Sequence, residues 1–270
     1  MMRLPINRLL LKLEAKARIR RTRPSPLMVA MIAISVFLLL EMLAVGVLGL
    51  TNIPLEMPER VTSMETYDLA VQQMNEQLLT FFEHYRPSPI ALALAFALLL
   101  MYLMVRFGFQ IYALRIARDE KADFGCLMDA FPIIGRVLAM EIMRTLIIFV
   151  GSFLIIPGVI LFYRYRQAFY LLAEHPEYSP VRCLKESGRL MRGRKLELFV
   201  LDVSFLGWYL LQSFLPYFGT FLGIWVLPYT EIAYAGYYCH IAGPRTAPDG
   251  KPFVDGEFQD ASDSDTPWEK

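Results

Sequence analysis

The sequence predicts an all-α membrane protein: a polytopic transmembrane helix bundle of about six spans with amphipathic interfacial helices. Hydrophobic residues make up 56% of the chain and charged residues only 20%, a more apolar balance than an ordinary soluble domain has. The charges also gather in blocks and leave long apolar runs between them. We expect a basic cytoplasmic segment over 1–26, a single transmembrane domain over 27–242 and a disordered acidic tail over 243–270.

The basic segment carries a helical charge pattern. Every fourth residue is basic, which would line one face of a helix: Arg8, Lys12, Lys16 and Arg20. Apolar residues would cover another face: Leu9, Leu10, Leu13 and Ala17. One interpretation is a helix on an anionic membrane surface, where each basic side chain contributes about 1 kcal/mol. The other is a charge cluster without a helix that only orients the chain. A nucleic-acid-binding arm is disfavoured because an apolar run begins directly afterwards.

Six apolar runs are expected to cross the membrane, whose core is about 30 Å thick. They cover residues 27–50, 89–109, 137–156, 159–173, 196–215 and 220–242. The fourth run follows a strong break at Pro157-Gly158 and contains Arg164 and Arg166. If these arginines cannot be buried, this run would be re-entrant. Residues 216–219 are expected to form the turn before the sixth run.

The acidic loop over 51–88 is expected outside the cell and contains an amphipathic helix. Thr62 followed by Glu65 predicts its start through a capping box. One apolar stripe follows at helical spacing: Tyr67, Val71, Met74, Leu78, Phe81 and Tyr85. The helix rests on the outer face of the bundle or binds a partner protein.

A second amphipathic helix is expected over 180–192. Ser179 and Pro180 predict its start, and Gly193 its end. An apolar stripe consists of Val181, Leu184, Gly188 and Met191. The stripe beside it holds the candidate interfacial basic residues Arg182, Lys185, Arg189 and Arg192. This arrangement is typical of a helix half-sunk at a cytoplasmic interface.

Positive charge predicts the topology. The N-terminal segment and the loops over 106–136 and 174–195 are basic, whereas the loop over 51–88 is acidic. Short basic loops stay in the cytoplasm. We therefore expect both termini to be cytoplasmic and the protein to lie in the bacterial cell membrane.

Charged residues inside the apolar runs form the candidate site. An ionised side chain at the middle of a bilayer costs about 2.5–3.5 kcal/mol, so such residues should pair inside the bundle. Matching their depths predicts a buried polar cluster of Glu41, Arg164, Arg166, Asp202 and Glu231. The cluster would bind an ion or an anionic lipid headgroup, since the arginine fork fits phosphate. Alternatively, it is an internal salt-bridge lock.

Enzyme, metal and cofactor motifs are missing from the sequence. There is no GxSxG, HExxH or glycine-rich phosphate loop. The three cysteines form no CxxC pair, and the histidines show no ligand spacing. We expect neither an enzyme nor a cofactor.

The central stretch resembles a family of bacterial integral membrane proteins of unknown function, DUF975. The resemblance rests on several motifs: the Pro157-Gly158 break, Tyr163 to Tyr165, Gly193 and Lys195, Asp202, Ser204-Phe205, Gly207-Trp208 and Pro228-Tyr229. It covers most of the chain from the first apolar run to about Ala242. It implies fold and location, because the family has no established activity.

Two functions remain open from the sequence. The first is a non-enzymatic membrane module that contacts the bilayer, in particular anionic lipids at the cytoplasmic face, or a membrane protein partner. The alternative is a small transporter or channel that uses the Arg/Glu cluster, since Pro157-Gly158 and Pro228 resemble the interrupted helices of transporters.

Overall fold

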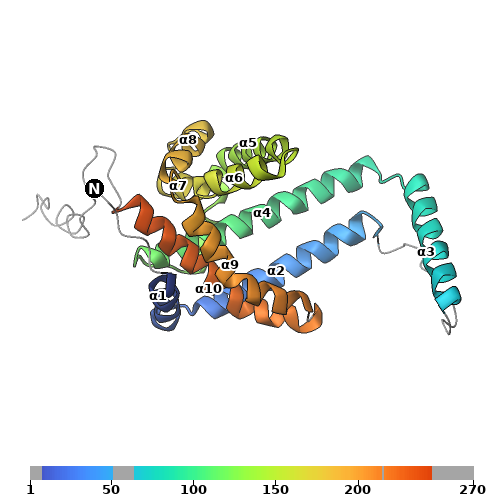
Figure 1. The fold of residues 1–270 in the computed structure, drawn as a ribbon, viewed down its shortest axis with the longest axis horizontal. Helices are drawn as coiled ribbons and strands as arrows, with labels where there is room; N and C mark the ends of the chain where they lie inside the picture. Colours follow the sequence, from blue (N-terminus) through green and yellow to red (C-terminus); the bar gives the residue numbers. More distant parts are fainter. Residues whose placement is uncertain (1–7, 51–63, 215, 245–270) are drawn as a thin grey trace, which may run out of the picture. The chain divides into compact units, whose positions relative to one another are not determined.

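The fold is all-helical in the parts of the chain that the structure describes. The structure is a computed structural model and describes residues 8–50, 64–214 and 216–244. These residues form ten α-helices, which are labelled in Figure 1. They are α1 (Arg8–Arg21), α2 (Pro26–Val47), α3 (Met64–His84), α4 (Pro89–Ala117), α5 (Ile134–Ser152), α6 (Ile155–Tyr165), α7 (Ala168–Glu174), α8 (Pro180–Leu190), α9 (Lys195–Phe214) and α10 (Pro216–Ala242), with short 3₁₀ helices η2 (Phe124–Met128) and η3 (Phe131–Ile133).

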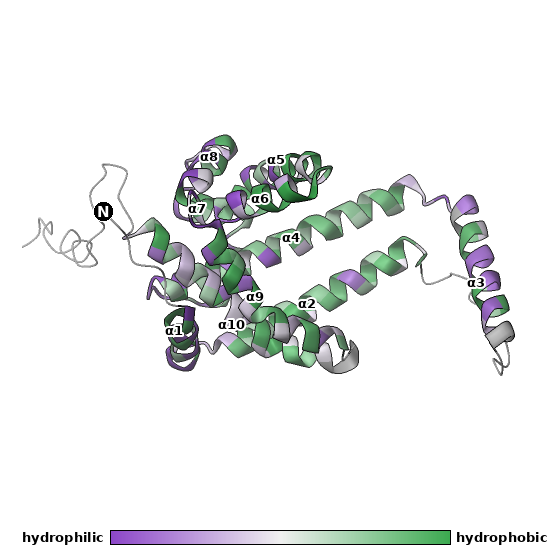
Figure 2. Cartoon of the chain, viewed as in Figure 1, coloured by the Kyte–Doolittle hydropathy of each residue, from purple (hydrophilic) through white to green (hydrophobic). Residues whose placement is uncertain are grey.

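Three of these helices are long and apolar enough to cross a membrane: α2, α4 and α9. Figure 2 shows α2 and α4 almost entirely hydrophobic, in contrast to the mixed surface of α3. The helix α5 carries three charges, and α6 and α7 are individually too short. The helix α10 is long but rich in tyrosine. The structure therefore supports membrane association, while the expected number of six spans stays a prediction.

The helices divide into two compact units. One unit contains residues 31–107. Within it, α2 and α4 meet through the rings of Phe37 and Tyr102, whose centroids are 4.8 Å apart. The hydroxyl of Tyr85, which follows α3, donates a 2.6 Å hydrogen bond to the carbonyl of Leu48. The predicted amphipathic helix is present as α3, and part of its apolar stripe is exposed, for example Tyr67 and Met74.

The other unit, residues 1–30 with 108–270, has its core around α10. The second half of α10 is buried almost continuously from Tyr229 to Tyr238. Phe205 of α9 packs edge-on against Tyr229 and Tyr234, with ring centroids 5.3 Å and 5.8 Å apart. The tyrosines of α10 are therefore core residues of this unit.

The basic N-terminal segment forms a helix that docks on protein. Leu11, Ala15 and Ile19 of α1 are buried, and α1 packs against α10. The ammonium group of Lys12 donates a 2.9 Å hydrogen bond to the carbonyl of Ser204 in α9. Burial lowers the pKa of Lys12, and the charges of Lys16 and Arg8 add to this effect.

This docking corrects the prediction for the segment. The predicted basic stripe is not simply a membrane-facing surface, because Lys12 and Lys16 lie over aromatic rings of α9 and α10. The docked face of α1 consists of Leu11, Ala15 and Ile19, which are spaced four residues apart. These three residues were not part of the predicted apolar face. The predicted apolar residues Leu9, Leu10 and Leu13 are exposed.

The third and fourth predicted spans appear as a helical hairpin with shifted boundaries. The helix α5 ends at Ser152, and α6 already begins at Ile155, so Pro157-Gly158 lies in the first turn of α6 rather than between two spans. Proline is tolerated in a first turn because the N–H groups there lack partners. The chain turns again after Tyr165, and α7 is separate.

Other boundaries also differ from the prediction. Residues 216–219, the predicted turn, belong to the first turn of α10. The helix α4 continues beyond residue 109 to Ala117. Ser179 is confirmed as the start of α8, since its hydroxyl accepts a hydrogen bond from the Arg182 N–H at 3.3 Å. Gly193 has a φ of +77° in the turn after α8. Thr62 and the tail beyond Pro244 lie outside the described residues.

Candidate functional site

An ion pair connects the α6–α7 turn with α9. Nη1 of Arg166 lies 3.1 Å from Oδ2 of Asp202. The Tyr163 hydroxyl donates a 2.9 Å hydrogen bond to the same oxygen. The guanidinium of Arg166 also lies over the ring of Tyr234, 4.6 Å from its centroid. The structure thus brings together Arg166 and Asp202, two of the five predicted cluster residues.

A second polar chain runs from Glu231 to the end of α4. Tyr170 donates a 3.4 Å hydrogen bond to Glu231 and stacks on Tyr238, with ring centroids 5.2 Å apart. Tyr238 donates a 2.7 Å bond to Glu174, which also accepts a 2.7 Å bond from Arg118. Glu231 also interacts electrostatically with Arg166. The Arg166–Asp202 ion pair and the hydrogen bonds from Glu231 to Arg118 therefore belong to one network.

Several network members were missed from the sequence. Arg118 and Glu174 lie in regions that were predicted as loops, and the tyrosines Tyr170 and Tyr238 were not among the predicted cluster residues. One signal could have found part of the network: Glu231, Tyr234 and Tyr238 are spaced three and seven residues apart, which places them on one face of α10.

Arg164 does not join this network. It is exposed, and its side chain lies against Gly188 of α8. Its backbone carbonyl accepts a 2.8 Å hydrogen bond from the Ser187 hydroxyl. Since Arg164 and Arg166 are two residues apart, they leave the helix on different sides.

Glu41 belongs to the other compact unit. It is exposed and lines a cavity of about 310 Å³ between apolar residues of α2 and α4. The remaining lining residues are Leu40, Ala44, Ala95, Leu98, Leu99 and Tyr102.

The four predicted interfacial basic residues are all exposed on or just after α8: Arg182, Lys185, Arg189 and Arg192. The opposite face of α8 is buried through Cys183, Leu184 and Ser187. Burial raises the pKa of the Cys183 thiol to about 11. Figure 2 shows both hydrophilic and hydrophobic residues along α8.

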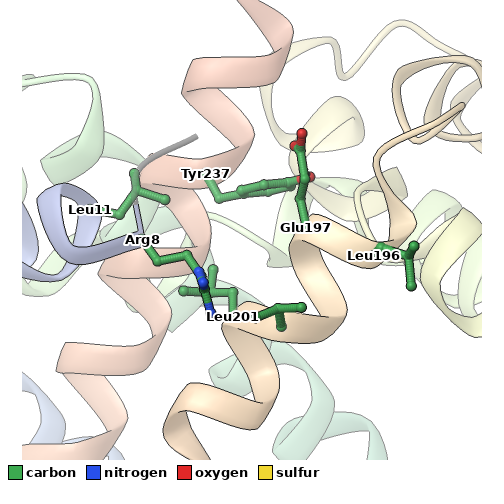
Figure 3. Close-up of a pocket in the computed structure, with 7 residues that line it drawn as sticks. Arg8, Leu11, Leu196, Glu197, Leu201 and Tyr237 are labelled. Carbon is green, nitrogen blue, oxygen red and sulfur yellow. The ribbon is translucent and has the colours of Figure 1, made fainter. Parts of the chain in front are cut away.

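A cavity of about 290 Å³ lies between α1, α9 and α10. Figure 3 shows Arg8 reaching from α1 towards Leu201, while the Tyr237 ring lies beside Glu197. Leu11, Leu196 and Val200 complete the lining. The Tyr237 hydroxyl donates a 3.2 Å hydrogen bond to the Arg194 carbonyl. The cavity is therefore mainly apolar with one cation and one anion.

The described residues also show whether side-chain groupings that bind metal ions are present. No group of three or more His, Cys, Asp or Glu side chains that could hold a metal occurs within residues 8–50, 64–214 and 216–244. The ionic network pairs opposite charges, and its hydrogen bonds join α4, α7, α9 and α10. Chemically, such pairing can hold helices together in a medium of low polarity.

These features define a class: an all-helical protein with apolar helices suited to a membrane. Within it, the chain belongs to the family described as "Protein of unknown function (DUF975)", which matches residues 72–244. The resemblance seen in the sequence is thereby confirmed. No curated protein and no solved structure matches the chain.

Proposed function

We propose that the chain is a multi-pass integral protein of the cell membrane, a non-enzymatic module whose cytoplasmic face binds anionic lipid. One observation carries the proposal: the apolar tip of the α5–α6 hairpin and the basic face of α8 are both exposed. The helix α8 itself packs against α5 and α6. At the tip, Phe153 is 81% exposed and Ile155 82%. In water such a tip would be unfavourable, whereas a bilayer would cover it.

The same observation refines the expected topology. The helix α6 is about 16 Å long, roughly half of a 30 Å membrane core. Arg164 lies against the basic helix α8, and Ile155 is only about 14 Å further along α6. We therefore infer that α5–α6 enters the bilayer from the cytoplasmic side and stops inside it. The helices α2, α4, α9 and α10 would cross, so both termini stay in the cytoplasm.

Two measurements test this function. The protein should remain in the membrane pellet during extraction with alkaline carbonate, which releases peripheral proteins. In neutral detergent it should bind phosphatidylglycerol in preference to phosphatidylcholine, and exchanging all four α8 cations for Gln should remove that preference. A matched control exchanges Arg20 and Arg21 of α1, both exposed, and should keep it. Release by carbonate, or an unchanged preference in the α8 variant, would contradict the proposal.

A small transporter is the second candidate, because Oδ1 of Asp202 is buried without a hydrogen-bond partner. A buried carboxylate oxygen of this kind could accept a cation or a proton. Ion flux into proteoliposomes that is lost in Asp202→Asn and in Glu231→Gln would favour the transporter. A folded protein without flux would favour the lipid-binding module.

A further inference from the structure

The Arg164 guanidinium lies across α8 at a position without a side chain. Its Nε is 2.8 Å, and its Nη2 3.4 Å, from the point where a Cβ of residue 188 would stand. A real Cβ at this place would push the guanidinium away. Gly188 therefore forms a notch that lets an arginine of α6 lie on the surface of α8.

The residue before the notch fixes the backbone of the same arginine. The buried Ser187 hydroxyl donates a 2.8 Å hydrogen bond to the Arg164 carbonyl. Since α6 ends at Tyr165, this carbonyl is among the last four of the helix, which have no partner within it. Ser187 and Gly188 together thus hold both the backbone and the side chain of Arg164 in place.

Two further cations lie within four residues of the notch along the chain. Lys185 precedes Gly188 by one helical turn and lies on the same side of α8. Arg192 follows in the turn after the helix. Both are exposed, as is Arg164. None of these three cations forms an ion pair with a carboxylate of a described residue. The ion pairs found among the described residues all involve other side chains.

The other two cations of α8 are already engaged. Arg189 forms a 3.0 Å ion pair with Glu186. The guanidinium of Arg182 stacks on the ring of Tyr178, 3.7 Å from its centroid. Arg164 lies over the ring of Tyr165 on its own helix, 5.6 Å from its centroid, a contact that uses the face of the guanidinium and not its N–H groups. The cations around Gly188 therefore differ from Arg189, which forms an ion pair within α8.

We propose that Arg164, Lys185 and Arg192 form a binding site for a single phosphate group at the Gly188 notch. The planar guanidinium of Arg164 can hold two phosphate oxygens, and the other two cations balance the remaining charge. The phosphate comes from a lipid headgroup or from a soluble phosphate compound. The site deepens the proposed function and rests on it, because membrane attachment places α8 at the headgroups.

Native mass spectrometry of the whole protein in neutral detergent tests the site. We expect a one-to-one adduct with phosphatidylglycerol and weaker binding of phosphatidylcholine. Arg164→Gln should weaken phosphatidylglycerol binding at least tenfold, as expected for a lost hydrogen bond between charged groups. Added inorganic phosphate separates the two sources. Competition indicates a soluble phosphate ligand, and its absence indicates a lipid headgroup.

Gly188→Ala gives the sharpest comparison because it leaves every charge in place. The new Cβ displaces the Arg164 guanidinium, so binding should weaken about as much as in Arg164→Gln. Arg189→Gln is the matched comparison: it removes a cation of the same helix outside the notch, so binding should weaken clearly less than in Arg164→Gln. If Gly188→Ala fails to fold, two other variants replace it. Lipid binding should weaken more in Lys185→Gln than in Arg182→Gln, because Lys185 belongs to the proposed site and Arg182 does not.

Equal losses in Arg164→Gln and Arg189→Gln, with no loss in Gly188→Ala, would overturn the site. Lipid would then be attracted by diffuse charge, and the proposed function would stand. Release of the protein from membranes by alkaline carbonate would instead refute the proposed function itself.

Discussion

Asp202 receives two hydrogen bonds on one oxygen, from Tyr163 and Arg166. Replacing Asp202 with Asn removes the charge that balances Arg166. We expect a loss of about 3 kcal/mol in the free energy of unfolding, the low end for a broken buried ion pair, because the two side chains are still 25% and 20% exposed. The midpoint of thermal unfolding in detergent measures it.

Two comparisons control this experiment. Glu186→Gln breaks the ion pair with Arg189, whose side chain is 73% exposed, and should cost less than about 1 kcal/mol. The double variant Arg166→Gln/Asp202→Asn should lose less stability than the two single losses together. Strictly additive losses would show that the two side chains are not coupled.

Cysteine reactivity reports on the buried face of α8. Burial raises the pKa of Cys183 from 9.0 to about 11, so at pH 8 its thiolate fraction falls to about one hundredth of that of an ordinary cysteine. We expect maleimide not to label Cys183 in the folded protein at pH 8 and to label it after denaturation. Peptide mass spectrometry gives the answer, and rapid labelling of the native protein would mean that α8 undocks.

At the scale of elements, the α5–α6 hairpin depends on close backbone packing. A Cβ on Gly158 would lie 2.9 Å from the Cα of Ser152, so backbone would have to move. A Cβ on Gly151 would be too close only to the Leu161 Cδ1, the end of a flexible side chain, while the Gly158 backbone would lie at ordinary contact distance, 3.5 Å. We expect Gly158→Ala to cost about 1–3 kcal/mol and Gly151→Ala clearly less. Thermal unfolding compares them.

Gly207→Ala of α9 is the reference for these two variants, since no atom lies within 4 Å of the added Cβ. It should be neutral or slightly stabilising. Equal effects of Gly158→Ala and Gly151→Ala would argue against backbone contact in the hairpin.

The helices were largely predictable, and the exceptions have identifiable causes. Ser179-Pro180 marks a helix start by known capping chemistry. The end of α6 at Tyr165 could not be predicted, because no proline or glycine follows there. At this point Arg166 forms an ion pair with α9, and the next helix, α7, is buried. Proline at 157 was interpreted as a break although proline is also tolerated in a first helical turn.

The candidate cluster was predictable only in part. The position of a residue along a helix gives its depth in the membrane, but not the side of the helix on which its side chain lies. Matching depths placed both arginines with Glu231 and Glu41 and put Asp202 nearer the cytoplasm, whereas in the structure Arg166 pairs with Asp202. Arg164 was placed beside them, yet residues two positions apart in a helix do not share a face. Glu41 belongs to a separate compact unit, which no pattern in the sequence indicated.

At the scale of the whole molecule, the topology depends on whether the α5–α6 hairpin adds two spans or none. The sequence interpretation treated residues 159–173 alone as the uncertain span, so that losing it would invert all later spans. In the structure α5 and α6 pack as one hairpin, and its two legs would cross together or stop together. Either way, we expect α8 to stay on the side where α5 begins, and the end of α10 to lie there too if α9 and α10 both cross.

A single cysteine at the tip distinguishes a crossing hairpin from one that stops within the bilayer. We expect Ile155→Cys to resist a membrane-impermeant maleimide in sealed vesicles of either orientation and to react after denaturation in detergent, because a bilayer surrounds the tip. Val181→Cys on the exposed face of α8 should react only from the cytoplasmic side. Labelling of Ile155→Cys from outside would mean that α5 and α6–α7 both cross, which would restore six spans and draw Arg164 away from the headgroups.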